Sequence, residues 1–170
     1  PTPRVGGLCL MLGLFFAHVA LLGRTGTAQD EFGYLLAAAT PAFLIGITED
    51  VTKSVGVQTR LAVTMIAASL GAWLLNGIVP RIDVPLIDRL LSWSPLAIAF
   101  TIFAVAGVSN ALNIIDGCNG LAAGYGVIVL TALAYVGFVV GDSFVTLSAL
   151  AMTGSLAGFL VFNYPFGRIF

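Results

Sequence analysis

Charged residues are scarce in this sequence. Only 9% of its 170 residues are Asp, Glu, Lys or Arg, whereas 59% are hydrophobic and the mean hydropathy is +1.05. An average soluble domain carries roughly 25% charged residues. So few charges cannot cover a water-exposed surface, and a formal net charge of −1 leaves no basic patch for a polyanion. The composition therefore excludes a nucleic-acid partner and indicates an integral membrane protein in contact with the lipid bilayer.

Cysteine, histidine and tryptophan are also rare. The two cysteines, Cys9 and Cys118, lie far apart in apolar surroundings, which gives no support to a disulfide framework or a zinc site. His18 stands alone in the first apolar stretch, so we expect it to be packed or interface-facing rather than catalytic. Trp73 and Trp93 are expected in the aromatic belts at the membrane surface.

Long apolar runs dominate the sequence instead. A helix needs about 20 apolar residues to cross roughly 30 Å of hydrocarbon. Six stretches reach or approach that length: residues 6–22, 32–48, 61–78, 94–110, 121–141 and 143–163. We therefore predict an all-α, polytopic transmembrane helical bundle with about six spans, forming a single membrane domain over residues 1–170. Residues 79–89 contain two prolines and alternating apolar residues, which predicts a short extended hairpin at the outer surface.

The connectors between the spans fall into two groups on opposite sides of the membrane. Four Lys or Arg residues lie in the group that includes both ends of the chain, and three lie in the other group. The positive-inside rule therefore favours the first group as cytoplasmic. All the polar clusters described below also fall in the first group, so we expect them to face the cytoplasm.

The first polar cluster consists of Glu49 and Asp50, followed by Lys53 and Arg60. Adjacent carboxylates repel each other unless a cation lies beside them. They suit a hard divalent ion or a general base at the membrane surface. The alternative is that the acidic pair merely ends a span at the interface.

The second cluster contains Asn110, Asn113 and Asp116, followed by a Gly-x-x-Gly loop over residues 117–120. At about 100° per residue, the three side chains fall within roughly 120° of one helix face. Two amides and a carboxylate on one stripe can bind a metal ion, or a phosphate through that ion. The alternative is hydrogen bonding between helices of the bundle.

The third cluster contains Asn163, Tyr164 and Pro165 with Arg168. Arg168 would be a natural phosphate clamp near a metal-and-phosphate site, although an isolated arginine is more often an interfacial residue. The residues alone do not distinguish phosphoryl transfer from ion-coupled transport, in which polar residues on broken helices also occur. A structural membrane subunit is the third alternative.

Four stretches of the sequence carry motifs in a characteristic order. They are residues 1–7, residues 46–50 with Arg60 ten residues on, residues 110–124 and residues 163–170. In order, spacing and sidedness these stretches resemble the polyprenyl-phosphate N-acetylhexosamine-1-phosphate transferases. The most specific of the four, residues 110–124, is similar to the family motif Asn-x-x-Asn-x-x-Asp-Gly-x-[Asp/Asn]-Gly-Leu-Ala-x-Gly. The resemblance covers essentially the whole chain.

The resemblance implies a Mg²⁺-dependent enzyme of the bacterial inner membrane that starts lipid-linked glycans such as peptidoglycan or the O-antigen of lipopolysaccharide. Such enzymes transfer a sugar 1-phosphate from a UDP-N-acetylhexosamine to polyprenyl (undecaprenyl) phosphate and release UMP. The amide form of the motif leans slightly toward N-acetylglucosamine-like sugars over the muramyl-pentapeptide. A homodimer is an open alternative to a monomer.

The resemblance also implies roles for the polar stripe. Asn113 would be a Mg²⁺ ligand by its place in the motif. Asn119 would lie where the family contacts the uracil or ribose. Asp116 and Asn110 would shape the nucleotide pocket.

The acidic pair has the catalytic role in the family that this sequence resembles. Glu49 and Asp50 would bind or deprotonate the lipid phosphate, or hold the metal, and Arg60 would meet a substrate phosphate. The family usually has Asp where this chain has Glu49, whose side chain reaches one methylene further. It usually has lysine where this chain has Gln58.

The family's motifs continue beyond Phe170. A metal-binding Asp three residues later, a His-rich cytoplasmic loop and a preceding first span are not in this sequence. We therefore expect the chain to be a fragment of a longer multi-span transferase, inactive by itself and active only within its full-length parent.

Overall fold

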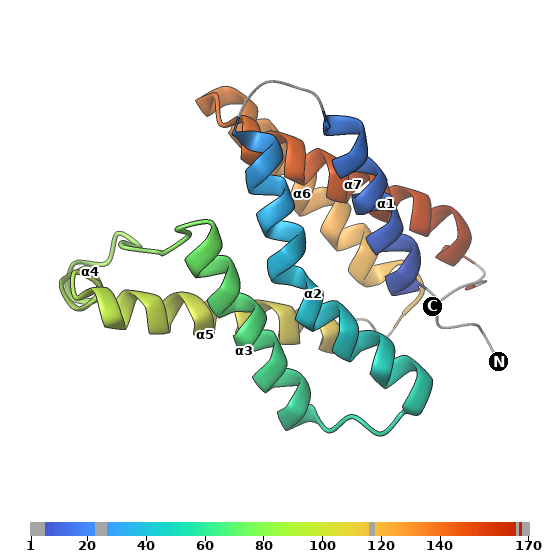
Figure 1. The fold of residues 1–170 in the computed structure, drawn as a ribbon, viewed down its shortest axis with the longest axis horizontal. Helices are drawn as coiled ribbons and strands as arrows, with labels where there is room; N and C mark the ends of the chain where they lie inside the picture. The colour runs from blue at the N-terminus through green and yellow to red at the C-terminus, as the bar shows by residue number, and fades with distance from the viewer. Residues whose placement is uncertain (1–5, 23–26, 116–117, 166, 168–170) are drawn as a thin grey trace. The chain divides into compact units, whose positions relative to one another are not determined.

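A computed structural model of the chain describes residues 6–22, 27–115, 118–165 and 167 (Figure 1). Within those ranges all regular structure is helical and no strand occurs. The helices of the described residues are α1 (Gly6–Leu21), α2 (Ala28–Thr52), α3 (Val57–Leu74), α4 (Pro85–Leu91), α5 (Ser94–Ile115), α6 (Leu121–Val140) and α7 (Ser143–Asn163). The predicted all-α architecture is therefore confirmed.

The helices agree with a chain that crosses a membrane several times. Five of those in the described ranges, α2, α3, α5, α6 and α7, are long and apolar enough to span a bilayer. Helix α1 is apolar but has only 16 residues. Five candidate spans and this shorter helix approximate the six predicted spans. The second predicted stretch, residues 32–48, lies within the longer helix α2, which has 25 residues. Pro41 lies inside this helix and does not end it, as membrane helices tolerate proline.

The chain divides into two compact units. One comprises Pro1–Leu36 with Leu112–Phe170, and the other comprises Ala37–Ala111. Both boundaries fall inside helices, so α2 and α5 each contribute to both units. The acidic pair and Arg60 belong to the second unit, and the loop that follows α5 belongs to the first.

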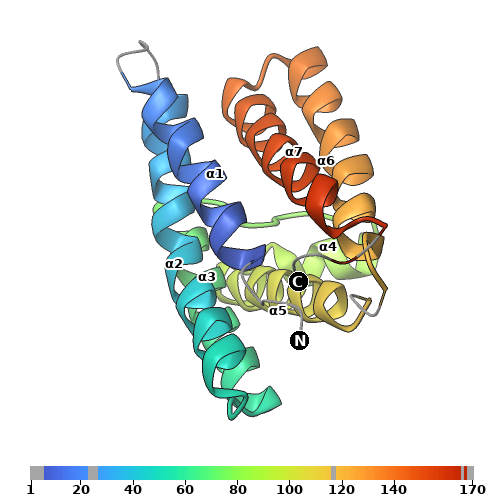
Figure 2. The ribbon, with the colours of Figure 1, turned by 90° about the vertical axis from the view of Figure 1, so that its right-hand side faces the viewer.

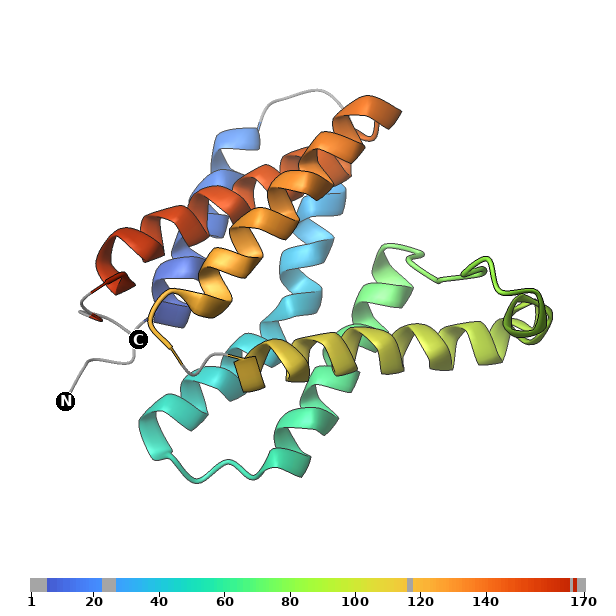
Figure 3. The same cartoon turned by 180° about the vertical axis from the view of Figure 1, so that it is seen from behind.

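In the first unit, α7 packs against both α6 and α1. Figure 2 and Figure 3 show α6 and α7 side by side and antiparallel. Glycines permit these contacts, because a Cβ added at Gly137 would lie 2.9 Å from Thr146 Oγ1. A Cβ added at Gly13 of α1 would lie 2.5 Å from Ser155 Oγ of α7. Small residues therefore allow the close approach that stabilises helix pairs in lipid, where the hydrophobic effect does not drive them together.

In the second unit, the buried apolar side chains are mostly small. They are Ala38, Ala68, Ala72, Leu91, Ala97 and Ala106. Helix α3 lies close to α2, since a Cβ added at Gly71 would be 3.8 Å from the Cβ of Ala38. Short side chains therefore let the middle of α2 approach the C-terminal part of α3.

The predicted extended hairpin over residues 79–89 is wrong. The segment is irregular as far as Val84, and α4 then begins with Pro85 at its first position. Proline suits that position because its fixed φ is helical and it has no N–H to leave unpaired. The Asp88 carboxylate accepts a hydrogen bond from Ile82 N at 2.8 Å, and such a contact does not follow from the alternation of apolar residues.

Candidate functional site

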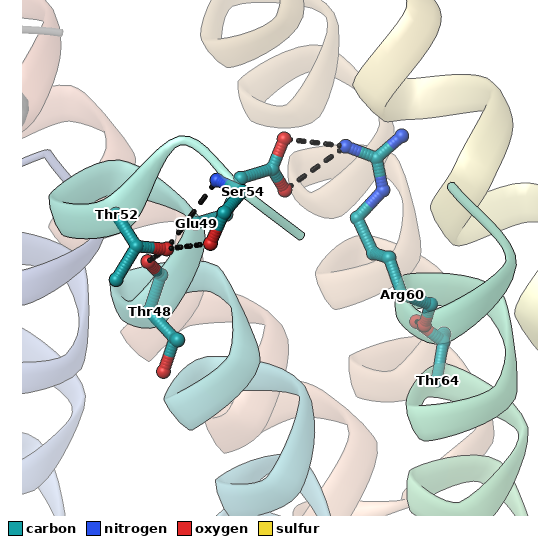
Figure 4. A network of polar contacts seen from close by, with 6 residues as sticks. All are labelled: Thr48, Glu49, Thr52, Ser54, Arg60 and Thr64. Atoms are coloured by element: carbon teal, nitrogen blue, oxygen red, sulfur yellow. Dashed lines mark hydrogen bonds and ion pairs between the residues drawn. The ribbon is translucent and has the colours of Figure 1, made fainter. Parts of the chain in front are cut away.

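Glu49 and Asp50 lie in the last turn of α2, as their position after an apolar run predicts. Hydroxyl groups brace this helix end: Thr52 Oγ1 donates to the carbonyl of Thr48 at 2.6 Å, and Ser54 Oγ donates to Thr52 Oγ1 at 2.9 Å (Figure 4). The C-terminal end of a helix carries partial negative charge, which disfavours carboxylates there. The acidic pair therefore requires a nearby cation.

Arg60 supplies that cation from the first turn of α3. Its Nη1 lies 3.0 Å from Oε1 and 3.0 Å from Oε2 of Glu49 (Figure 4). An arginine near a helix N-terminus is disfavoured by the macrodipole in the same way as a glutamate near a C-terminus. The ion pair offsets both unfavourable placements, and it joins two helices across the 53–56 connector.

The other two members of this predicted cluster, Asp50 and Lys53, are not part of the ion pair between Glu49 and Arg60. Asp50 is half-buried in the same helical turn as Glu49. Lys53 has a φ of +51° just beyond α2, is exposed, and forms no ion pair within the described residues. The cation that pairs with the acidic motif is therefore Arg60 and not the nearer Lys53.

The polar stripe lies on α5 as predicted. Asn110 and Asn113 are three residues apart in one continuous helix and so share a face, with Asn110 half-buried and Asn113 exposed. Asp116, the third predicted member, lies outside the described residues, and the same holds for Arg168 of the third cluster.

A buried asparagine joins the loop before α6 to the end of α7. Asn163 is 3% exposed, and its Oδ1 accepts a hydrogen bond from Gly120 N at 2.5 Å. Its carbonyl accepts another from Gly167 N at 2.7 Å. Asn119 Nδ2 donates to the carbonyl of Pro165 at 3.4 Å. These contacts hold Asn119, a predicted nucleotide contact, against the segment after α7.

Sequence reasoning ranked this third cluster below the others and missed its structural role. Gly120 adopts a φ of +78°, and a Cβ added there would lie 3.0 Å from Tyr164 Cδ2. A Cβ added at Gly167, with a φ of +55°, would lie 2.7 Å from Asn119 Nδ2. The signal in the sequence was a glycine in each loop, one directly after Asn119 and one four residues after Asn163. Glycine is the residue that adopts positive φ with least strain.

Comparison with known proteins bears on this arrangement. Residues 32–170 match the family model described as glycosyl transferase family 4. The chain belongs to this family. The matched region contains the acidic pair, Arg60, the polar stripe on α5 and Asn163 with its hydrogen-bond partners. The resemblance drawn from the sequence motifs is thereby confirmed.

Relatives of the family align with 99% of the chain. A phospho-N-acetylmuramoyl-pentapeptide-transferase of Caldanaerobacter subterraneus subsp. tengcongensis is 26% identical over 178 residues, and one of Limosilactobacillus fermentum is 30% identical over 172 residues. A probable undecaprenyl-phosphate N-acetylglucosaminyl 1-phosphate transferase of Bacillus subtilis is 29% identical over 171 residues. The alignments cover 55%, 54% and 46% of these relatives, so the chain spans about half the length of the curated relatives it matches. No solved structure matches the chain.

The donor atoms in these family motifs are oxygens, the type that Mg²⁺ prefers. Within the described part of the chain, no group of three or more His, Cys, Asp or Glu side chains could hold a metal ion. Mg²⁺ commonly uses one or two protein carboxylates and completes its shell with water and substrate phosphates. A sparse set of Asp and Asn oxygens therefore fits this ion better than it fits Zn²⁺, which prefers closed cages of Cys and His.

His18 has the packed position that its isolation in an apolar stretch predicts. Its ring centroid lies 5.9 Å from that of Phe32, which is fully buried. Its Nδ1 is buried and has no hydrogen-bond partner within the described residues. His18 is therefore packed in an apolar setting and makes none of the polar contacts described above for the motif residues.

Proposed function

We propose that this chain is part of a membrane transferase that moves an N-acetylhexosamine 1-phosphate from a UDP-sugar to polyprenyl phosphate. The observation that carries the proposal is the acidic pair at the end of α2, with Arg60 held against it, in a chain of glycosyl transferase family 4. The names of its relatives support the same chemistry, since they specify N-acetylhexosamine groups and, in one case, undecaprenyl phosphate.

The proposed reaction exchanges one phosphoanhydride bond for another. An oxygen of the lipid phosphate forms a bond to the β-phosphorus of the UDP-sugar, and the bond from that phosphorus to the bridging oxygen breaks. UMP leaves with the bridging oxygen, and the product is a polyprenyl diphosphate sugar. Where the lipid phosphate is protonated, a carboxylate of the acidic pair accepts the proton. Catalysis of such a transfer is mainly positioning and neutralisation of charge.

The polar stripe and the loop after it would bind the nucleotide end of the donor. We assign Asn113 to Mg²⁺, which when bound supplies positive charge to the diphosphate. We assign Asn110, Asp116 and Asn119 to the nucleotide. The hydrogen bonds around Asn163 support the role of Asn119, because they hold its loop in one conformation.

We further propose that the parent enzyme lies in the bacterial inner membrane with these motifs facing the cytoplasm. The apolar candidate spans support the membrane location, and the bacterial source of its relatives supports the organism class. A homodimer is an alternative assembly to a monomer. Cross-linking of the full-length protein in native membranes would distinguish the two.

The test is turnover by the full-length gene product that contains this chain. Purified in detergent with undecaprenyl phosphate, it should release UMP from UDP-N-acetylglucosamine or from UDP-N-acetylmuramoyl-pentapeptide, and chelation of Mg²⁺ should abolish the release. Failure of both donors in a folded preparation would contradict the proposal. Full activity after chelation, with no other divalent cation present, would contradict the Mg²⁺ assignment alone.

A further inference from the structure

We infer that α4 lies along the surface of the membrane and is a binding site for lipid. Leu86, Leu90 and Trp93 form its α4 lipid face, which enters the boundary between headgroups and acyl chains. Arg89, beside this face, binds the phosphate of an anionic lipid headgroup. The inference goes beyond the proposed function and shares no residue with it.

The α4 lipid face consists of large apolar side chains that the protein leaves uncovered. Leu86, Leu90 and Trp93 are 72%, 54% and 65% exposed. Leu86 and Leu90 are four residues apart and share one face of α4, and Trp93 N donates to the carbonyl of Leu90 at 3.2 Å. Leu91, about 140° round the helix from Leu86, is only 3% exposed. The helix therefore packs on the protein with one side and presents an apolar face with the other.

The orientation of α4 suits a helix that lies in the plane of the membrane. It belongs to the connector between α3 and α5, both of which are long and apolar enough to span a bilayer. The irregular backbone that precedes α4 requires water or headgroups, so the connector lies at the membrane surface. Figure 1 and Figure 3 show α4 nearly end-on while α5 runs across the view, so their axes cross steeply. A short helix across the end of a spanning helix lies along the interface.

Tryptophans at both ends of the connector indicate lipid as the occupant of this face. Trp73 lies in the last turn of α3 and Trp93 directly precedes α5, and both are exposed. Tryptophan at the ends of spans lies at the level of the headgroups. Further along the two spans, Ile66 of α3 and Phe103 of α5 are also exposed. The α4 lipid face continues this apolar surface of the spans, which favours lipid over a second protein.

Arg89 places a positive charge beside the α4 lipid face. It is exposed and forms no ion pair within the described residues, whereas Arg81 pairs with Asp83 at 2.9 Å. Its acidic neighbour, Asp88, accepts a hydrogen bond from a main-chain N–H of the connector. Three residues separate Arg89 from Leu86, so the two leave α4 within about 60° of each other. One such cation at the membrane surface favours anionic lipid by about 5-fold.

Spin labels at single cysteines test what covers the face. The full-length gene product, freed of its other cysteines, is reconstituted in lipid nanodiscs and labelled at Leu86→Cys, at Leu90→Cys or at Asp83→Cys. Collisions of the label with oxygen, which concentrates in hydrocarbon, are compared with collisions with a water-soluble nickel chelate. Labels at positions 86 and 90 should collide more with oxygen. The label at position 83, where the native side chain is 80% exposed on the same connector, should show the reverse.

Two results would overturn the inference. More collisions with nickel at positions 86 and 90 would mean that the face is open to water. Protection from both reagents would mean that protein covers it, either a second copy or another part of the parent chain. Both leucines are exposed, so their replacement leaves the packing of Leu91 in place, and either position alone decides the result.

The role of Arg89 is tested by photo-crosslinking from the same face. p-Benzoylphenylalanine in place of Leu86 is irradiated in bilayers with equal amounts of phosphatidylglycerol and phosphatidylcholine, and the captured lipids are identified by mass spectrometry. Phosphatidylglycerol should be captured about 5-fold more often, and Arg89→Gln should reduce this ratio to about 1. Arg81→Gln, the matched control, should leave the ratio unchanged. Equal capture of the two lipids, or a ratio that Arg89→Gln does not change, would contradict the assignment of Arg89. Neither experiment measures turnover, so both results are independent of the proposed function.

Discussion

At the residue scale, Asn163 shows how one buried residue can organise a loop. It lies at the last position of α7. Its side-chain Oδ1 accepts a hydrogen bond from Gly120 N, and its main-chain carbonyl accepts one from Gly167 N. A buried N–H left without an acceptor costs more free energy than the hydrogen bond contributes, so the loop conformation depends on this side chain.

Asn163→Ala should therefore destabilise the protein by about 1–3 kcal/mol, because Gly120 N loses its acceptor in a partly buried setting. Reversible unfolding of the full-length protein in mixed detergent micelles measures the change. Gln58→Ala, at an exposed position of α3, is the control and should shift the free energy of unfolding by less than about 0.5 kcal/mol. Equal stability of Asn163→Ala and wild type would show that the loop does not depend on this amide.

Residue identities were easier to predict than residue partners. Glu49, Asp50 and Arg60 could be singled out from the sequence because charged residues are rare beside apolar spans. The contact between Glu49 and Arg60 could not be, because it bridges eleven residues and depends on how α2 and α3 pack. The same is true of Asn163, whose amide reaches a glycine 43 residues away.

At the element scale, glycine positions determine how closely α6 and α7 pack. Gly137 faces the start of α7, where an added Cβ would lie 3.0 Å from the backbone N of Thr146 and 3.0 Å from Val145 Cγ1. Backbone atoms cannot move aside as the end of a flexible side chain can. Gly124 of the same helix has open space around an added Cβ.

Gly137→Ala should destabilise the protein by about 1–3 kcal/mol through overpacking of α6 against α7. Gly124→Ala is the matched control on the same helix, and it should be neutral or stabilise by roughly 0.5–1 kcal/mol because alanine favours the helix. The unfolding assay described for Asn163→Ala measures both. A loss at Gly124 as large as that at Gly137 would argue that helix packing does not explain the glycine pattern.

Apolar run length was a good guide to the helices, and alternation was a poor guide to the connector. Every predicted span corresponds to a helix of the described residues, because a run of about 20 apolar residues has few other stable structures in a bilayer. Residues 79–89 instead form part of α4 and an irregular segment, where Val79 N donates to the buried hydroxyl of Thr101 at 2.9 Å. The conformation of that segment depends on a contact with α5. The local alternation of apolar and polar residues does not reveal such a contact.

At the scale of the whole molecule, the proposed function requires that the family motifs face the cytoplasm. The acidic pair ends α2, and the 76–84 segment lies at the other end of α3. A helix that crosses the membrane once puts its two ends on opposite sides. The 53–56 connector and the 76–84 segment should therefore differ in their access to reagents outside the cell.

Single cysteines test this orientation in a background that carries Cys9→Ala and Cys118→Ala. A membrane-impermeant maleimide applied to intact spheroplasts should label the Asp83→Cys variant and spare Ser54→Cys until the membrane is opened. Labelling of Ser54→Cys in intact spheroplasts would reverse the proposed orientation.

The most direct test of the central claim follows the two phosphorus atoms of the donor separately. UDP-N-acetylglucosamine or UDP-N-acetylmuramoyl-pentapeptide labelled with ³²P at either the α- or the β-position is incubated with undecaprenyl phosphate and the full-length protein. Transfer of a sugar 1-phosphate predicts that the β-label moves into the lipid while the α-label is released as UMP. Asp50→Asn should slow the labelling of the lipid and the release of UMP by about 100-fold or more. Release of both labels together as UDP, or wild-type rates with Asp50→Asn, would contradict it.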